Sequence, residues 1–404
     1  MSEERERIDA FVADAQRAYE RLSGERGEGL IVFHDDADGI CSGAIASQLL
    51  DELGLSYYMA CVEKVFPQVL ELINDARCDF LVFADLGSGR ADKISELISK
   101  DRKVYIFDHH DAKSVEDPRL IHLNPELHGL SGERMASGAT VNYMVARQLG
   151  KEALKLAWMA VVGSAEIPGS LGWLNWVALQ DSLKVGDASR EVRGEKEKIH
   201  VGVFGDPREY RYLSGKLTVL GSVGYYEDGP QEAVSACVFR ELGDVWPKIS
   251  SLEKRRSEAF QGLRGRINED GLYALDNVQW FDAGDAFRGM GTKVIGGFTS
   301  HLRYQTRIVH REKYILGFMD MEDRIPGLGR IGGDLRKVSV RVHPRLEKLI
   351  EVGRRQPVSA LIEASAFHSG GYGDGHDVAG SAVIPQRNMD EFIKTFNDLA
   401  SGQR

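Results

Sequence analysis

Residues 30–39 read Leu-Ile-Val-Phe-His-Asp-Asp-Ala-Asp-Gly, an apolar run followed at once by a histidine and three aspartates. Four consecutive apolar residues bounded by polar ones are typical of a buried strand. Aspartate favours the start of a helix, because its side chain accepts hydrogen bonds from free backbone N–H groups. The stretch therefore predicts a buried strand, an acidic turn and a helix across Ser42–Leu53.

The same pattern of an apolar run ending in acidic or histidine residues occurs twice more. Phe80–Phe83 precedes Asp85, and Lys103–Phe107 precedes Asp108-His109-His110. Helical spacing is found before, between and after these runs, at residues 6–22, 91–99 and 137–165. Strands that alternate with helices predict an α/β fold with a parallel sheet.

The polar residues after these three runs form a candidate metal site. The carboxyl ends of parallel strands face one crevice, so side chains that follow different strands meet there. Carboxylates together with imidazoles suit Mn²⁺ or a similar ion, whereas an all-oxygen site would favour Mg²⁺. Asp85, in the central position, is the predicted bridging ligand, and Asp35 is expected to be a solvated neighbour. The candidate ligands are His34, Asp36, Asp38, Asp85, Asp108 and His109.

A second, strand-rich part of the chain begins near Leu272. The expected strands are Lys293–Phe298, Thr306–His310, Tyr314–Met319 and Lys337–Val342, followed by helices at Pro344–Val352 and Met389–Leu399. Between the helices lies a glycine-rich stretch, Ser369–Gly380. We predict a catalytic domain over residues 1–250, a connecting helix over 251–270 and a smaller mixed α/β domain over 271–404.

Composition narrows the class of protein. The 404 residues carry a formal net charge of −10, which argues against a broad basic surface that coats duplex DNA. No apolar run approaches the ~20 residues that span a membrane, so no membrane partner is expected. The four cysteines form no C-x-x-C pair, which indicates neither a zinc site nor a disulfide framework. These features are typical of a cytoplasmic protein.

Together, these motifs resemble a known family. Asp108-His109-His110, with His34-x-Asp36-x-Asp38-Gly39 and Asp85 upstream, resembles the motif set of the DHH phosphoesterase superfamily. Within this superfamily the motifs resemble the RecJ-like exonucleases, especially their archaeal branch. The order and spacing of the motifs fit that resemblance over nearly the whole chain.

The C-terminal part adds an independent match. Gly375-His376 resembles the glycine–histidine signature of the DHHA1 domain, which follows the catalytic domain in this family. Ser339-x-Arg341 resembles the substrate-contacting Ser-x-Arg of the same domain. The resemblance implies that Gly375 allows a phosphate to approach the backbone, while His376 and Arg341 bind its charge.

The resemblance also implies an activity. Members are usually Mn²⁺-dependent two-metal hydrolases in which metal-activated water attacks a phosphodiester. It places His34, Asp36, Asp38, Asp85, Asp108 and His109 in or beside the metal shell, and His110 facing a ligand or the phosphate. The implied substrate is single-stranded DNA or RNA, cut from an end in a cleft between the domains. A helicase or another replisome component is the implied protein partner.

One motif departs from the family pattern. The family has an aspartate four residues beyond a glycine, and here the position four residues after Gly163 holds Ile167. Glu166 lies one residue earlier and is the predicted substitute ligand. Without it one metal lacks a ligand, and the chain becomes a weakened enzyme or a replication scaffold. A phosphodiesterase of short oligonucleotides or cyclic dinucleotides also stays open, and an inorganic pyrophosphatase is disfavoured by the C-terminal signature.

Overall fold

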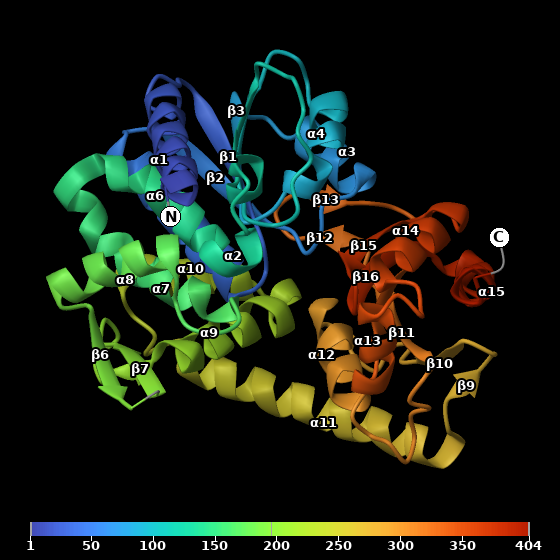
Figure 1. Ribbon diagram of the computed structural model, residues 1–404. Helices are drawn as coiled ribbons and strands as arrows, with labels where there is room; N and C mark the ends of the chain where they lie inside the picture. The colour runs from blue at the N-terminus through green and yellow to red at the C-terminus, as the bar shows by residue number, and fades with distance from the viewer. Residues whose placement is uncertain (1, 195, 403–404) are drawn as a thin grey trace. The chain divides into compact units, whose positions relative to one another are not determined.

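A parallel sheet carries the three acidic motifs. Within residues 2–194, five strands pair in the order β2-β1-β3-β4-β5, and every pair is parallel (Figure 1). The three strands predicted from apolar runs are confirmed. Strands β2 and β5, which were not predicted, are partly exposed, although residues 57–61 of β2 also form an apolar run. The strands are β1 (Glu28–Phe33), β2 (Ser56–Cys61), β3 (Phe80–Ala84), β4 (Lys103–Phe107) and β5 (Leu120–Leu123).

The register of the sheet aligns the motifs. Phe33 of β1 lies opposite Ala84 of β3, and Ala84 lies opposite Phe107 of β4. The next residues along the three strands are His34, Asp85 and Asp108, so they leave the sheet in one row. The direction in which successive strands are added also reverses between β1 and β3. Open α/β sheets bind ligands at such a switch point.

Helices bury the sheet. The central helix α2 is buried along most of its length and packs against α6, α7 and α10. The helical stretch predicted at 137–165 is confirmed: it consists of α6, a 3-10 segment at Arg147–Leu156 and α7, with a break at Gly150, whose φ is +72°. The helices of this unit are α1 (Ser2–Leu22), α2 (Ala37–Glu52), α3 (Pro67–Asp75), α4 (Ala91–Leu97), α5 (Gly132–Met135), α6 (Gly138–Ala146), α7 (Ala157–Gly163), α8 (Trp173–Val185), α9 (Tyr210–Thr218) and α10 (Gly229–Phe239).

The computed structural model describes residues 2–194 and 196–402. Residues 1, 195 and 403–404, which fall within the predicted domains, lie outside the described residues. The chain divides into two compact units, 1–250 with 325–329, and 251–324 with 330–404. Helix α11 (Trp246–Asp270) begins in the first unit and continues into the second. An antiparallel arrangement of β6 (Ala188–Arg193), β7 (Lys196–Val201) and β8 (Arg208–Glu209) completes the first unit.

The second unit is built on a mixed sheet. Among residues 251–402, six strands pair in the order β15-β16-β14-β11-β10-β9, with β10 and β11 parallel and the other pairs antiparallel. A two-stranded pair, β12 (Arg324–Ile325) with β13 (Gly329–Arg330), lies outside it. The sheet strands are β9 (Tyr273–Ala274), β10 (Val278–Asp282), β11 (Tyr314–Met321), β14 (Leu335–Arg341), β15 (Tyr372–His376) and β16 (Ala379–Pro385).

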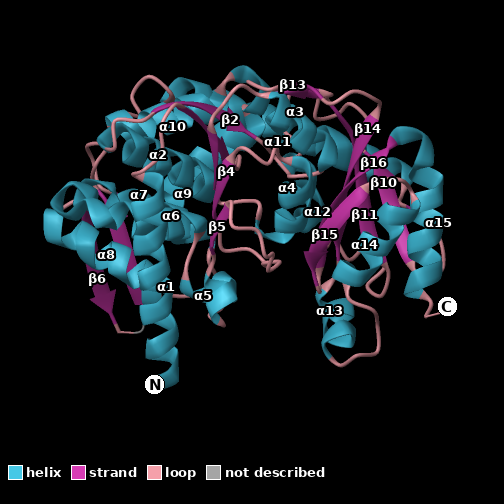
Figure 2. Ribbon diagram, turned by 90° about the horizontal axis from the view of Figure 1, so that it is seen from above, coloured by secondary structure: helices cyan, strands magenta, loops and turns pink. Residues whose placement is uncertain are grey.

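Helices cover both faces of this mixed sheet. Val338, Val340 and Phe318 face a core shared with α13 (Pro344–Glu351), α14 (Val358–His368) and α15 (Met389–Ala400). On the other face, α12 (Lys293–Leu302) packs on β11 and β14 (Figure 2). The fold is therefore α/β, a parallel-sheet unit followed by a mixed-sheet unit, as predicted.

Two predicted strands of the second unit were wrong. Lys293–Phe298 lies in α12, because its buried residues Val294, Ile295, Phe298 and Leu302 follow helical rather than alternating spacing. Thr306–His310 forms turns after α12. No helix among the described residues has the length and apolar character that a membrane crossing requires.

Candidate active site

The turn after β1 places two of the predicted ligands together. Asp36 caps α2, and its Oδ1 accepts a hydrogen bond from the Gly39 N–H at 3.0 Å. Its Oδ2 lies 2.9 Å from Nδ1 of His34. The backbone N–H of Ala37, in the same turn, donates a hydrogen bond to Oγ1 of Thr218 at 3.0 Å. The turn is therefore fixed by contacts at both ends.

Asp38 lies in the first turn of α2 and binds the start of another helix. Its two carboxylate oxygens accept hydrogen bonds from the Gly138 and Ala139 N–H groups, each at 2.8 Å. These donors begin α6, whose N-terminal end carries a partial positive charge that favours a carboxylate. The hydrogen bonds fix the Asp38 side chain beside the end of β3.

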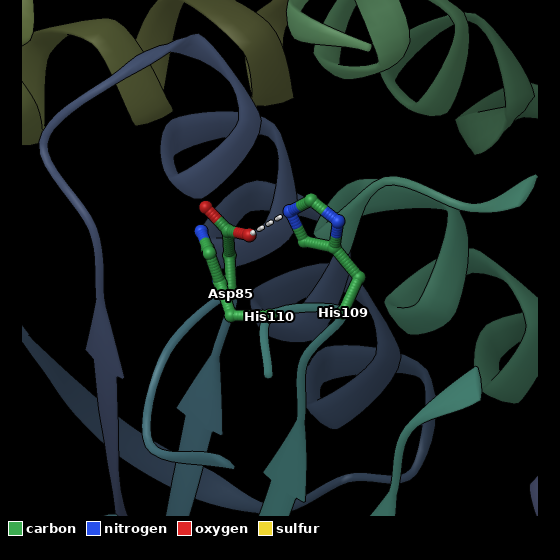
Figure 3. Close-up of side chains that lie close together, drawn as sticks. All are labelled: Asp85, His109 and His110. Carbon is green, nitrogen blue, oxygen red and sulfur yellow. Dashed lines mark ion pairs between the residues drawn. The ribbon is translucent and has the colours of Figure 1, made fainter. Parts of the chain in front are cut away.

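Asp85 lies at the centre of the acidic group. It is 1% exposed and has φ +66°, a left-handed conformation that is strained for a residue with a side chain. His109 turns its ring toward Asp85, with Nε2 3.5 Å from Asp85 Oδ1 and 3.5 Å from Asp38 Oδ2 (Figure 3). Gly138 leaves room for this arrangement, since a Cβ there would lie 2.1 Å from Asp85 Oδ1.

Asp108 is engaged in a hydrogen-bond network of its own. Its Oδ2 accepts from the Ser88 N–H at 2.9 Å, and its Oδ1 accepts from the backbone N–H groups of His109 and His110 at 2.7 and 3.2 Å. Nδ1 of His110 lies 2.7 Å from the same Oδ1. Asp108 therefore holds the two histidines in place.

The donor set fits divalent cations. Ligand atoms of Asp85, His109 and His110 lie within 4.8 Å of one another, and so do those of His34, Asp36 and Asp85. Asp85 belongs to both groups, the position of a bridging ligand. Its Oδ1 is buried and has no hydrogen-bond partner among the described residues, which is costly unless a cation neutralises it. Mixed carboxylate and imidazole ligands suit a first-row ion such as Mn²⁺.

The electrostatics of the site also favour a bound cation. Burial raises the pKa of the Asp85 carboxyl well above its ordinary value, and the charges of Asp38 and Asp36 raise it further. Burial likewise raises the pKa of Asp38, against the opposing effect of His109. The pKa of His109 is lowered by burial and by neighbouring His110, which favours the neutral imidazole that binds metals.

The pair of Asp108 and His110 has the opposite character. Burial would raise the pKa of Asp108, but the adjacent His110 holds it well below its ordinary value. Burial would lower the pKa of His110, but Asp108 raises it to about 9. The His110 side chain is half exposed, so a cationic imidazole is presented to a ligand at neutral pH.

Asp35 is buried, contrary to the expectation that it is solvated. It is 1% exposed instead of solvated, and its nearest ionic partner is Nε2 of His34 at 3.4 Å. Neither carboxylate oxygen has a hydrogen-bond partner among the described residues. A Cβ on Gly221, in the π-helical turn Val219–Val223, would lie 2.2 Å from the Asp35 carbonyl oxygen, so this turn packs closely against the Asp35 backbone.

The segment that departs from the family pattern forms a 3-10 turn after α7. Ile167 is 5% exposed and packs into the core, whereas Glu166 is exposed. Oε1 of Glu166 accepts a hydrogen bond from Thr218 Oγ1 at 3.3 Å, and Thr218 also binds the turn after β1. The charge of Glu166 acts on Asp85. Glu166 therefore faces the acidic group, and its role as a ligand stays a prediction.

The second unit brings its four predicted residues to one end of three adjacent strands. Arg341 of β14 lies opposite Ala379 of β16, which lies opposite His376 of β15. The Arg341 guanidinium binds the hydroxyls of Ser300 and Ser339 at 3.0 and 3.3 Å. Burial, together with the charge of Arg303, lowers its pKa to about 10.

Gly375 and His376 differ in surroundings. A Cβ on Gly375 would lie 2.5 Å from the carbonyl oxygen of Ala379, so the pairing of β15 with β16 itself requires glycine. His376 is exposed. The glycine–histidine signature thus has a structural reason for its first residue, and its phosphate-binding role stays a prediction.

Several supporting residues have no sequence motif. Asn124 donates through Nδ2 to Ser88 Oγ at 2.8 Å and to the His110 carbonyl at 2.8 Å. Thr218 joins the turn after β1 to Glu166. The only sequence signal for Gly138 is the helix start Ser137-Gly-Ala-Thr140, where Ser137 caps α6.

Comparison with known proteins agrees with this site. Residues 29–163, which contain all three strand-end motifs, match the N-terminal domain of the DHH family. This match supports the predicted resemblance to the DHH family over that part of the first unit.

Similar proteins span the whole chain. The uncharacterized protein MJ0831 of Methanocaldococcus jannaschii is 24% identical over 95% of this chain and 96% of its own. The structure of RecJ from Thermus thermophilus with Mn²⁺ is similar in fold, with a TM-score of 0.62 and 14% identity over 97% of this chain. This chain spans 55% of that RecJ chain. An exonuclease RecJ bound to manganese gives a TM-score of 0.59 at 16% identity, covering 96% of this chain and 94% of its own. The DHH domain therefore lies in a chain with a RecJ-like fold.

Proposed function

We propose that the protein is a metal-dependent phosphodiesterase that degrades single-stranded DNA or RNA from an end. The observation that carries the proposal is the buried carboxylate Asp85, which is shared by two groups of ligand atoms and left without a hydrogen-bond donor among the described residues. Bound divalent cations activate water and neutralise charge on the phosphoryl oxygens. The RecJ-like fold supports this choice of reaction class.

The residues of the DHH domain would then have distinct roles. His34, Asp36 and Asp85 would hold one cation, and Asp85 with His109 another, with Asp38 orienting His109. Asp108 orients both histidines through its hydrogen bonds. The half-exposed His110, cationic at neutral pH, would bind a phosphate oxygen or donate a proton to the leaving oxygen.

The second unit supplies groups suited to binding nucleotides. Arg341 presents a partly buried guanidinium beside the Ser339 and Ser300 hydroxyls, a donor set that binds phosphate. His376 lies two strands away at the same end of the sheet. The predicted cleft between the domains and a helicase or replisome partner stay part of this proposal.

The proposal is tested with end-labelled single strands of DNA and RNA, from 2 to 20 nucleotides long. Incubation with Mn²⁺, Mg²⁺ or chelator is expected to give metal-dependent shortening from one end, lost in Asp85→Asn. A ladder from long strands supports the exonuclease, and cleavage of dinucleotides alone supports the short-oligonucleotide or cyclic-dinucleotide alternative. Absence of any cleavage by a folded, Mn²⁺-loaded protein would refute the enzyme.

Whether the proposed enzyme is fully active or weakened depends on whether Glu166 is a metal ligand. If it replaces the aspartate missing at Ile167, Glu166→Gln should reduce the bound Mn²⁺ from two ions to one and lower turnover about 100-fold, in the range that loss of a catalytic carboxylate gives. Electron paramagnetic resonance of Mn²⁺ titrations measures the stoichiometry. Glu152→Gln, at an exposed glutamate of the same unit, is the control. Unchanged stoichiometry and rate in Glu166→Gln would show that Glu166 is no ligand.

A second function is favoured by Ile167 itself. An apolar, 5% exposed side chain stands where the family has an acidic ligand. A chain that binds a single strand with or without Mn²⁺ but never cleaves it would be a replication scaffold. The same assay distinguishes the two functions, because strand binding and cleavage are measured separately.

A further inference from the structure

Helix α9 differs in charge from the rest of its unit. Residues 1–250 contain 28 Lys and Arg against 41 Asp and Glu. Within this acidic background α9 (Tyr210–Thr218) has no acidic residue and two cations, Arg211 and Lys216; Arg208 and Glu209 precede it. A local excess of positive charge in an acidic domain indicates a place where anions bind.

The exposed side of α9 also presents aromatic rings. Tyr212 is 43% exposed, and its ring lies 5.0 Å from Nζ of Lys216 and 6.0 Å from the Arg208 guanidinium carbon. The Trp246 ring lies 6.3 Å from it, at 38°. Residues 212 and 216 are spaced by four in α9, so they lie along one face of the helix, and Arg208 of β8 reaches the same Tyr212 ring. We call Arg208, Tyr212, Lys216 and Trp246 the α9 strip.

Helix α9 ends at the candidate active site of the same unit, and Thr218 points to a different side of the helix from Tyr212 and Lys216. Thr218 ends α9 and hydrogen-bonds both the turn after β1 and Glu166. Six residues separate Tyr212 from Thr218, about 9 Å at 1.5 Å per helical residue. Stacked nucleotides rise by about 3.4 Å each, so the distance corresponds to a few nucleotides. Arg211 holds the neighbouring loop by donating to the Gly169 carbonyl at 2.6 Å.

We propose that the α9 strip binds the single strand a few nucleotides away from the scissile phosphate. Arg208 and Lys216 would contact backbone phosphates, and an unpaired base would stack on Tyr212 beside Trp246. Cations interleaved with aromatic rings suit single strands, because every unpaired base offers a stacking face. The inference rests on the proposed function and adds to it the path of the strand.

The test compares two double variants that each remove an arginine and an exposed aromatic ring from the same unit. Arg208→Ala/Tyr212→Ala removes half of the strip, and Arg193→Ala/Phe239→Ala is the matched control at side chains 87% and 75% exposed. Fluorescence anisotropy with a labelled 20-nucleotide single strand in chelator gives the Kd at several salt concentrations. The strip variant should bind about 10-fold more weakly, and its plot of log K against log salt should be shallower by about one.

The outcomes separate this inference from the proposed function. Equal Kd values for wild type, strip variant and control would overturn the α9 strip, even with metal-dependent cleavage intact. Weaker binding by the strip variant alone would support the strip, even if no strand is cleaved. Lys216→Gln, which removes the charge and keeps a polar side chain, is an independent variant and should weaken binding about threefold, as expected for one lost phosphate contact.

Discussion

Replacing Gly138 with alanine is expected to lower hydrolysis about 100-fold, because displacement of a reacting group by 1 Å costs on that order. The new Cβ would lie 2.1 Å from Asp85 Oδ1, so either Asp85 or the start of α6 must move. Moving α6 also shifts the N–H groups that hold Asp38. One methyl group would thus disturb two carboxylates at once.

The matched control for this variant is Gly262→Ala. Gly262 also lies in a helix, α11, but nothing lies within 4 Å of a Cβ built there. Alanine at such a site should stabilise the protein by about 0.5–1 kcal/mol and leave turnover unchanged. Steady-state rates and thermal unfolding distinguish the two glycines, and wild-type turnover in Gly138→Ala would show that Asp85 has room to move.

Asp85→Asn is expected to abolish the stabilisation that Mn²⁺ gives. Wild type should gain about 2.7 kcal/mol in free energy of unfolding when free Mn²⁺ is 100-fold above Kd. The variant, lacking the shared ligand, should gain little. In chelator, without Mn²⁺, Asp85→Asn should be more stable than wild type. Asparagine removes a buried charge that has no hydrogen-bond partner among the described residues. Calorimetric Tm values with and without Mn²⁺ measure both effects.

The pH dependence in chelator has a definite sign. The pKa of Asp85 is raised above 3.8 in the native protein, so between 3.8 and the raised value the native state binds more protons than the unfolded state. Stability must therefore fall as the pH rises through this range. Asp85→Asn should show a smaller decrease. An equal pH dependence in both proteins would show that Asp85 is not the group responsible.

Much of the first unit could be predicted because its signals are local. The apolar runs before His34, Asp85 and Asp108 identify three buried strands, and their polarity changes mark the ends where ligands gather. By contrast, β2 was not predicted although residues 57–61 form an apolar run; its first four residues are exposed or partly exposed, and it lies at the edge of the sheet beside β1.

The residues that were not predicted act through long-range contacts. Gly138 and Thr218 meet the turn after β1 only in the folded chain, so their neighbours in sequence carry no trace of the role. Asp35 was expected at the surface because it adjoins ligands, and tertiary packing buries it. In α12, β-branched residues led to the prediction of a strand. The segment is a helix, because its apolar residues lie on one helical face that packs against the mixed sheet.

The hydrogen bonds from α6 to Asp38 join residues 100 and 101 positions apart. Such contacts form late in folding, since the chain must close a long loop first. Repulsion among the carboxylates is then absent from early folding and acts mainly on the finished structure. It should leave the folding rate nearly unchanged and speed unfolding, as expected for interactions absent from the transition state. The lifetime of the native chain would therefore depend on the supply of divalent cations.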